Sequence, residues 1–302
     1  MNSRPTASAP RLDPRWYQIA MLSGLLLYGQ LALQFGLSWW RIGAVICACL
    51  LTQLAGTRLA LLPRFDPLSA LISGIGLCTL MRTQFLAIAL LTAVIAVGSK
   101  FVIRRSGGHL YNPTNFALAL MLALGLIWVS PGQYGHFAFA AFLIVGMGVL
   151  VTTQSSRGDV SLAFLGVWAA LLFGRSLWLG EPMAIPLHRL QSGMLLQFTF
   201  NMISDPRTTP RSRPGRLLFG TLVALGAYAV QFVLFRTNGP IWSLAAFTLL
   251  VPLFDRVLPG ARHEWRTSSP ASTPTRGVVH ETPVPLPASS PALDGALSRG
   301  RA

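Results

Sequence analysis

Ten apolar stretches follow one another along this chain, and they restrict it to a bundle of membrane helices. They cover roughly residues 17–37, 42–62, 68–81, 84–103, 115–130, 137–152, 161–179, 187–204, 217–235 and 241–255. A helix needs about 20 residues to cross a bilayer. Only 11% of the 302 residues are charged, whereas soluble proteins carry about a quarter. The sequence predicts an all-α, polytopic membrane protein with ten spanning helices, or nine if one short stretch does not cross.

The basic residues indicate how these helices are oriented. Loops on the cytoplasmic side of a membrane carry an excess of Arg and Lys. With a cytoplasmic N-terminus, the even-numbered loops should be basic, and the fourth and eighth loops are the clearest cases. They hold Lys100, Arg104, Arg105, Arg207, Arg211, Arg213 and Arg216. The sequence therefore predicts a multi-pass protein with both termini in the cytoplasm. All of its Lys and Arg residues except Lys100 are Arg, which fits a GC-rich bacterial genome, so the membrane is expected to be the bacterial inner membrane.

The chain divides into three regions. Residues 1–15 form a basic cytoplasmic tail, and residues 16–258 form the transmembrane domain. Residues 259–302 are rich in Pro, Ser and Arg, which predicts a disordered cytoplasmic tail that touches anionic lipid headgroups. Five spans in each half, 16–133 and 134–258, would give the halves opposite orientations. Such inverted repeats place a ligand between the halves, beside broken helices.

Polar residues mark the eighth stretch as part of a site. His188, Gln191, Ser192 and Thr199 have the spacing of one face of a single spanning helix. Lipid offers no hydrogen bonds, so amides and hydroxyls at this depth need protein partners or a wet cavity. We expect this helix face to line a cavity.

Two polar loops frame the candidate site. Asp205 and Pro206 should end the eighth helix, with Asp205, Thr208 and Thr209 bonded to freed backbone groups. Arg207 lies in the same loop. In the fourth loop, Asn112 precedes Pro113 and favours a turn, and Thr114 or Asn115 is expected to cap the next helix.

Several functions are disfavoured by the sequence. It contains no GxGxxG, P-loop, HExxH or nucleophile-elbow motif, and we assign no catalytic residue and no metal site. Cys47, Cys49 and Cys78 lie in apolar stretches and are expected to be buried. The arginines lie between apolar runs, which argues against nucleic acid as a partner. No carboxylate lies at the centre of a stretch, so ion pumping by this chain alone is disfavoured.

The two polar loops carry a resemblance. His109–Phe116 and Met202–Pro210 resemble the signature loops of the NqrB/RnfD family, the membrane subunits of the sodium-pumping NADH:quinone oxidoreductase and of the Rnf electron-transport complex. Gln191–Thr209 is most similar to the UnbU-type branch, which occurs beside enediyne biosynthesis genes. The resemblance covers roughly residues 15–258. It implies ten helices in two inverted repeats of urea-transporter-like architecture, and a place in a membrane redox chain.

The resemblance also concerns a flavin. Members of the family attach FMN to a threonine in a Ser-Gly-Ala-Thr type motif. Here Ser192-Gly193-Met194-Leu195 shares only its first pair and is expected inside a helix, so covalent FMN is not expected. Non-covalent FMN or riboflavin remains compatible with the family. Arg207, Arg211, Arg213 and Arg216 could bind its phosphate, although the topology explains the same arginines.

Three hypotheses remain open. The chain is a membrane electron-transport subunit that holds a flavin or quinone and works with other redox subunits. Alternatively, it is a small-solute or ion channel or transporter on the same scaffold, or a structural anchor for redox partners. The candidate cofactor-binding residues are His188, Gln191, Ser192, Thr199, Asp205, Arg207, Thr208, Thr209, Asn112, Thr114 and Asn115.

Overall fold

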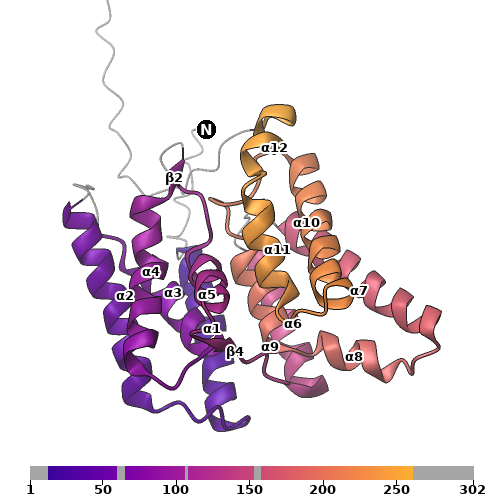
Figure 1. Cartoon of the computed structure of the whole chain (residues 1–302), viewed down its shortest axis with the longest axis horizontal. Coiled ribbons are helices and arrows are strands. Elements are labelled where there is room, and N and C mark those ends of the chain that lie inside the picture. Colours follow the sequence, from indigo (N-terminus) through magenta and orange to yellow (C-terminus); the bar gives the residue numbers. More distant parts are fainter. Residues whose placement is uncertain (1–12, 60–64, 106–107, 153–157, 261–302) are drawn as a thin grey trace, which may run out of the picture. The chain divides into compact units, whose positions relative to one another are not determined.

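The computed structural model describes residues 13–59, 65–105, 108–152 and 158–260, and this part of the chain is predominantly helical (Figure 1). The expected tails lie outside the described residues, except for residues 13–15 of the first and 259–260 of the second. Each of the ten apolar stretches coincides with at least one helix. The apolar runs thus predicted where helices occur, but not where each one begins, ends or breaks.

The described residues of the first half form five helices and four very short strands. The helices are α1 (Pro14–Leu31), α2 (Trp39–Leu59), α3 (Pro67–Leu80), α4 (Leu86–Val102) and α5 (Pro113–Ala123). β1 (Met81–Arg82) follows α3 and pairs antiparallel with β4 (Trp128–Val129), which follows α5. β2 (Arg104–Arg105) pairs with β3 (Gly108–His109) between α4 and α5. The short helices α3 and α5 are therefore each followed by a short extended segment, directly for α3 and after a turn for α5.

The second half contains α6 (Gly135–Thr152), α7 (Gly158–Leu179), α8 (Ala184–Leu190), α9 (Gly193–Gln197), α10 (Arg213–Tyr228), α11 (Gly239–Thr248) and α12 (Val251–Val257). Two π-helical turns interrupt this pattern. η1 (Phe198–Met202) continues α9, and η2 (Ala229–Val233) continues α10. π-Helical turns often occur at functional sites.

The prediction of one spanning helix over residues 187–204 is wrong. The helix ends at Leu190 and restarts at Gly193, with Ser192 in an extended conformation. The Ser192 hydroxyl accepts a hydrogen bond from the Leu195 backbone N–H at 3.0 Å, so Ser192 is an N-cap and not a helix interior residue. A Cβ on Gly193 would lie 2.0 Å from the Tyr134 ring, so only glycine fits beside it.

The break separates the polar residues that were expected to share one face of this segment. His188 lies before the break and Ser192 and Thr199 after it. The η1 turn also changes the helical phase. The four side chains therefore do not share one helix face.

Several helices are long and apolar enough to cross a membrane. Within the described residues these are α2, α7 and the continuous helix Arg213–Val233. A fourth is obtained if α11 and α12, which are bent by 52°, count as one broken span. α3, α4, α5 and part of α6 are apolar but shorter. The chain is a multi-pass membrane protein, whereas the count of ten spans stays a prediction.

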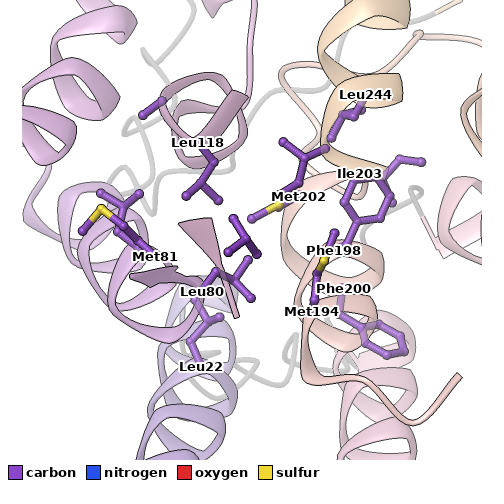
Figure 2. Packing of buried hydrophobic residues seen from close by; sticks show 14 of the residues in the cluster. Leu22, Leu80, Met81, Leu118, Met194, Phe198, Phe200, Met202, Ile203 and Leu244 are labelled. Atoms are coloured by element: carbon purple, nitrogen blue, oxygen red, sulfur yellow. The ribbon is translucent and has the colours of Figure 1, made fainter. Parts of the chain in front are cut away.

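The buried apolar side chains form one cluster that includes residues from both halves. Figure 2 shows Leu80 and Leu118 of the first half on one side and Phe198 and Met202 of η1 on the other. Burying such side chains contributes about 1.5–3 kcal/mol each in water. In a membrane protein, close packing and internal hydrogen bonds contribute more to helix association. The polar contacts between the halves are therefore important for their association.

Candidate functional site

The two signature loops contact each other. His109 Nε2 lies 3.3 Å from Asp205 Oδ2, and the Asn112 side-chain amide donates to the same oxygen at 3.3 Å. The Asn112 amide also lies 3.4 Å from the carbonyl of Asn201 in η1. The side chains of His109 and Asp205 are only 8% and 16% exposed. We call His109, Asn112 and Asp205 the loop latch, because they join the first half to the second.

Asp205 also organises the loop that follows η1. Its Oδ1 accepts from the Arg207 backbone N–H at 3.0 Å, and its carbonyl accepts from the hydroxyls of Thr208 and Thr209. The predicted role of these three side chains in ending the helix is confirmed. Burial disfavours the ionised carboxylate. The hydrogen bond and charge of His109, together with Arg207, outweigh it and hold the pKa of Asp205 below its usual 3.8.

Asn112 also stabilises the start of α5. Its Oδ1 accepts from the Asn115 backbone N–H at 3.1 Å, so Asn112 is the N-cap. The expectation that Thr114 or Asn115 caps this helix is wrong. Pro113 occupies the first helical position, where its missing N–H costs nothing. Thr114 and Asn115 are instead buried one turn into α5.

Further amides join the halves deeper in the structure. The Asn115 side chain donates to the Ile241 carbonyl at 3.3 Å, and the Gln197 side chain donates to the Gly76 carbonyl at 2.8 Å. We call Asn112, Asn115, Gln197 and Asn201 the interface amides. Gln197 and Asn201 were not among the predicted site residues, and the partner of the Gln197 amide lies 121 residues away in sequence.

The interface amides are incompletely satisfied. Among the described residues, Asn115 Oδ1, Gln197 Oε1 and both side-chain atoms of Asn201 are buried without a hydrogen-bond partner. The Thr199 hydroxyl on η1 is also buried without a hydrogen-bond partner among the described residues. An unpaired buried polar atom costs about 1–3 kcal/mol. Oxygens predominate among these atoms, so whatever satisfies them must chiefly donate hydrogen bonds or carry positive charge.

A pocket of about 660 Å³ lies beside α8. The Gln191 side-chain nitrogen lies 2.6 Å from His136 Nδ1 at this pocket. Two of its lining residues, His188 and Gln191, were predicted site residues, whereas Gln133, His136 and Arg189 were not. Its lining is Gln133, His136, Ala184, Ile185, Leu187, His188, Arg189 and Gln191. We call it the α8 pocket.

α8 is held in place by an aromatic ring. The guanidinium groups of Arg175 on α7 and Arg189 on α8 lie 4.9 and 5.1 Å from the centre of the Phe232 ring. Arg175 also forms an ion pair with Glu181 at 2.7 Å, which holds the pKa of Glu181 below its usual value. A guanidinium group over an aromatic ring stabilises by about 0.5–2 kcal/mol. They fix the wall of the α8 pocket against α7 and η2.

The structure does not gather the eleven predicted residues in one place. His188 and Gln191 line the α8 pocket, and Ser192 caps α9. Asn112 and Asp205 form the loop latch with Thr208 and Thr209 beside it, and Arg207 is exposed. Thr114, Asn115 and Thr199 are buried in the helices.

The predicted arginine cluster is partly occupied by carboxylates. Arg216 forms an ion pair with Asp159 at 2.6 Å, and Arg211 lies 3.6 Å from Asp255. These two guanidinium groups are therefore not free to clamp a phosphate. The described residues contain no group of three or more His, Cys, Asp or Glu placed to hold a metal ion.

The cysteines partly follow the expectation. Cys49 and Cys78 are buried, but the expectation for Cys47 is wrong, because it is exposed on α2. Positions two apart on a helix point to different sides. Cys47 consequently faces outward from the helices while Cys49 faces inward.

Part of the chain matches a known protein family. Residues 122–262 match the NQR2, RnfD, RnfE family. The chain is similar to this family over these residues. The match includes the second signature loop and Asp205, and it begins after the first signature loop. The resemblance predicted from the loops to proteins of this type is thereby confirmed, and the assignment to the UnbU-type branch stays a prediction.

Three relatives are each named as the D subunit of an ion-translocating oxidoreductase complex. The one from Erwinia tasmaniensis is 27% identical over 139 residues, which is 45% of this chain and 36% of that protein. The one from Shewanella amazonensis is 29% identical over 129 residues, 42% of this chain and 36% of that protein. The one from Cronobacter sakazakii is 26% identical over 151 residues, which is 50% of this chain and 42% of that protein. The matched region thus spans well under half of each relative's length.

Proposed function

We propose that this protein is a membrane component of an ion-moving electron-transport complex in the bacterial inner membrane, with other redox proteins as its partners. The loop latch is the observation that carries the proposal. The loops that give the family resemblance meet through His109, Asn112 and Asp205, in contacts between buried polar groups. The names of the three relatives support the same function.

The proposal includes two inverted repeats of five spans and cytoplasmic termini. Short helices that begin after a polar residue, at matching places in the two halves, support the repeats. In the first half, α3 begins after Asp66 and α5 after Asn112. In the second half, α9 begins after Ser192 and α11 after Asn238. Broken helices at corresponding positions are the mark of inverted-repeat transport folds.

We further propose that the α8 pocket holds a non-covalent flavin, with a quinone as the alternative occupant. Its volume lies within the range of about 300–1,000 Å³ that is typical of cofactor sites. Arg189, His136 and Gln133 can donate hydrogen bonds to ring carbonyls or a phosphate, and Ile185 and Leu187 offer apolar surface. A bound flavin supplies one- and two-electron transfer, and these side chains orient its ring.

The fit does not extend to covalent attachment. Leu195 stands where the family's motif has its threonine, and it is buried. The nearby Ser192 hydroxyl is engaged as the cap of α9. We therefore propose that any flavin is held by non-covalent contacts only.

The pocket proposal is tested with the purified full-length chain. Wild-type protein should show the blue absorbance of a flavin or take up added FMN or riboflavin, and Gln191→Leu and His136→Phe should weaken binding at least tenfold. Gln84→Leu, an exposed glutamine outside the pocket, is the matched control. If the protein binds a short-chain ubiquinone but no flavin, the occupant of the pocket is a quinone and not a flavin. Failure to bind either ligand would refute the site.

Membership of a complex is tested separately. An affinity-tagged chain, extracted from its native membrane in mild detergent, should co-purify with flavin- or iron–sulfur-containing subunits. Asp205→Asn should reduce this recovery, and Glu181→Gln should not. Recovery of the chain alone under conditions that preserve other membrane complexes would refute the proposal.

A second candidate function is passage of a small solute or ion between the halves. The unpartnered atoms of the interface amides and of Thr199 favour it, because a permeating species would satisfy them. Thr199→Val should lower flux into proteoliposomes several-fold. Thr92→Val is the control, since that hydroxyl is already bonded to the Ile88 carbonyl at 2.7 Å. Equal flux in both variants would eliminate this function.

A further inference from the structure

Arginines outnumber carboxylates where α10 begins and α12 ends. Asp159 is already paired with Arg216 at 2.6 Å. Asp255 is shared by Arg105 and Arg211, at 3.9 and 3.6 Å, and its Oδ1 also accepts from the Arg211 backbone N–H. Both carboxylates are therefore occupied. They cannot neutralise further positive charge at this end of the helices.

Three more arginines lie around this junction with their side chains exposed. They are Arg207 in the loop after η1, Arg213 at the start of α10 and Arg256 near the end of α12. In the part of the chain that the structure describes, none of the three forms an ion pair. The chain after α12 lies against the loop before α10, because a Cβ on Gly260 would be 2.5 Å from the Ser212 backbone nitrogen. Arg213 and Arg256 thus flank one helix junction.

Apolar side chains lie next to these charges. Arg213 and Leu217 are four residues apart on α10, and Leu253 and Arg256 are three apart on α12, so each pair shares a helix face. Leu217, Leu253 and the neighbouring Val257 are 41%, 54% and 67% exposed. The surface therefore offers a guanidinium group and an apolar flank at both helices. A phospholipid needs this combination, for its phosphate and for its acyl chains.

We propose that the α10–α12 junction is a binding site for an anionic phospholipid with two phosphates, held by Arg213 and Arg256 and assisted by Arg207. Guanidinium groups bind phosphate oxygens through two parallel hydrogen bonds, and basic pockets between helices recognise headgroups of this charge. Two arginines on separate helices match two phosphates better than one. An acidic soluble protein would meet the arginines from the water side only, whereas the exposed leucines and valine beside them belong to candidate spanning helices, whose outer surface faces acyl chains.

The test measures lipid retention and thermal stability of the full-length chain. Wild-type protein in neutral detergent should retain diphosphatidylglycerol in native mass spectrometry, and the added lipid should raise its Tm. The Arg213→Gln/Arg256→Gln variant should keep its lipid-free Tm but bind the lipid about thirtyfold more weakly. Arg236→Gln, an exposed arginine just after η2, is the matched control and should bind like wild type.

Four outcomes would contradict the proposed site. Unchanged lipid binding in the double variant would assign the lipid to another part of the chain, including the basic region beyond residue 260. An equal Tm increase with phosphatidylcholine would show that headgroup charge is irrelevant. An equal increase with inorganic phosphate at the same concentration would show simple charge screening. Phosphatidylglycerol should bind more weakly than the two-phosphate lipid, and equal binding would contradict the assignment of one phosphate to each helix.

Discussion

The imidazole of His109 lies 3.3 Å from the carboxylate of Asp205, although 96 residues separate them in sequence. This contact, with Asn112 on the same oxygen, joins the loop before α5 to the loop after η1. Because the surrounding helices bring mainly apolar side chains to the interface, these polar contacts fix its register. Hydrogen bonds have direction, so a shift of one residue between the halves would leave Asp205 unpaired.

Asp205→Asn should destabilise the protein by about 1–3 kcal/mol. The asparagine keeps one oxygen for the Arg207 N–H. It then turns its NH₂ group toward the Asn112 side-chain amide, which is also a donor. Denaturant or thermal unfolding in detergent measures the loss. Glu181→Gln, in a partly exposed ion pair with Arg175, is the control and should change stability little. Equal stability of the two variants would mean that the loop latch is unimportant.

The stabilisation by Asp205 should depend on pH in one direction. The folded-state pKa of Asp205 lies below its ordinary value of 3.8. Its ionised form therefore stabilises the fold fully above that value, and this contribution is lost as the pH falls through the folded pKa. The Tm difference between wild type and Asp205→Asn should persist on acidification to about pH 5 and shrink below pH 3.8. A difference that grows below pH 3.8 would contradict the sign.

The sequence located the helices because apolar runs report burial or lipid contact directly. It also predicted the end of the eighth helix, because Asp205 and Pro206 act on their immediate neighbours. The break before α9 was not predictable in the same way. The spacing of His188, Gln191 and Ser192 fits a continuous helix, and the ring that requires glycine at position 193 belongs to Tyr134, far away in sequence.

The candidate site shows the same division between local and distant causes. Asn112 and Asp205 were predicted as polar loop residues, but their contact depends on the packing of two halves. The α8 pocket combines His136 and Arg189 from separate segments, and neither belongs to a motif. Residues that act through distant partners leave no periodic signal in one sequence.

Gly220→Ala should be strongly destabilising, by about 1–3 kcal/mol. A Cβ at position 220 of α10 would lie 2.7 Å from the Val160 carbonyl oxygen and 3.2 Å from the Phe164 backbone nitrogen of α7. Backbone atoms of a packed helix cannot move aside as a side chain can. Gly166→Ala, on α7 with nothing within 4 Å of the new Cβ, should be neutral or stabilising. Thermal unfolding compares the two variants, and the reverse order would refute the close α7–α10 contact.

Gly76→Ala should weaken the hydrogen bond by which the Gln197 side chain joins the two halves. The new Cβ would lie 3.0 Å from Gln197 Nε2, which donates to the Gly76 carbonyl at 2.8 Å. The amide must shift by a few tenths of an ångström, which weakens its hydrogen bond to the Gly76 carbonyl. Its Oε1 already lacks a partner, so the cost approaches that of an unsatisfied amide, about 1–3 kcal/mol, partly offset by the helix preference of alanine.

A double-mutant cycle with Gln197→Leu isolates the energetic coupling between Gly76 and the Gln197 amide. The apolar leucine removes the amide, so Gly76→Ala should cost less in the Gln197→Leu background, with a coupling energy of about 0.5–3 kcal/mol. Gly98→Ala on α4, where a Cβ meets nothing within 4 Å, controls for helix propensity and should couple to Gln197→Leu by less than about 0.5 kcal/mol. Equal coupling for the two glycines would show that Gln197 does not hold α9 to α3, because only Gly76 lies within reach of its amide.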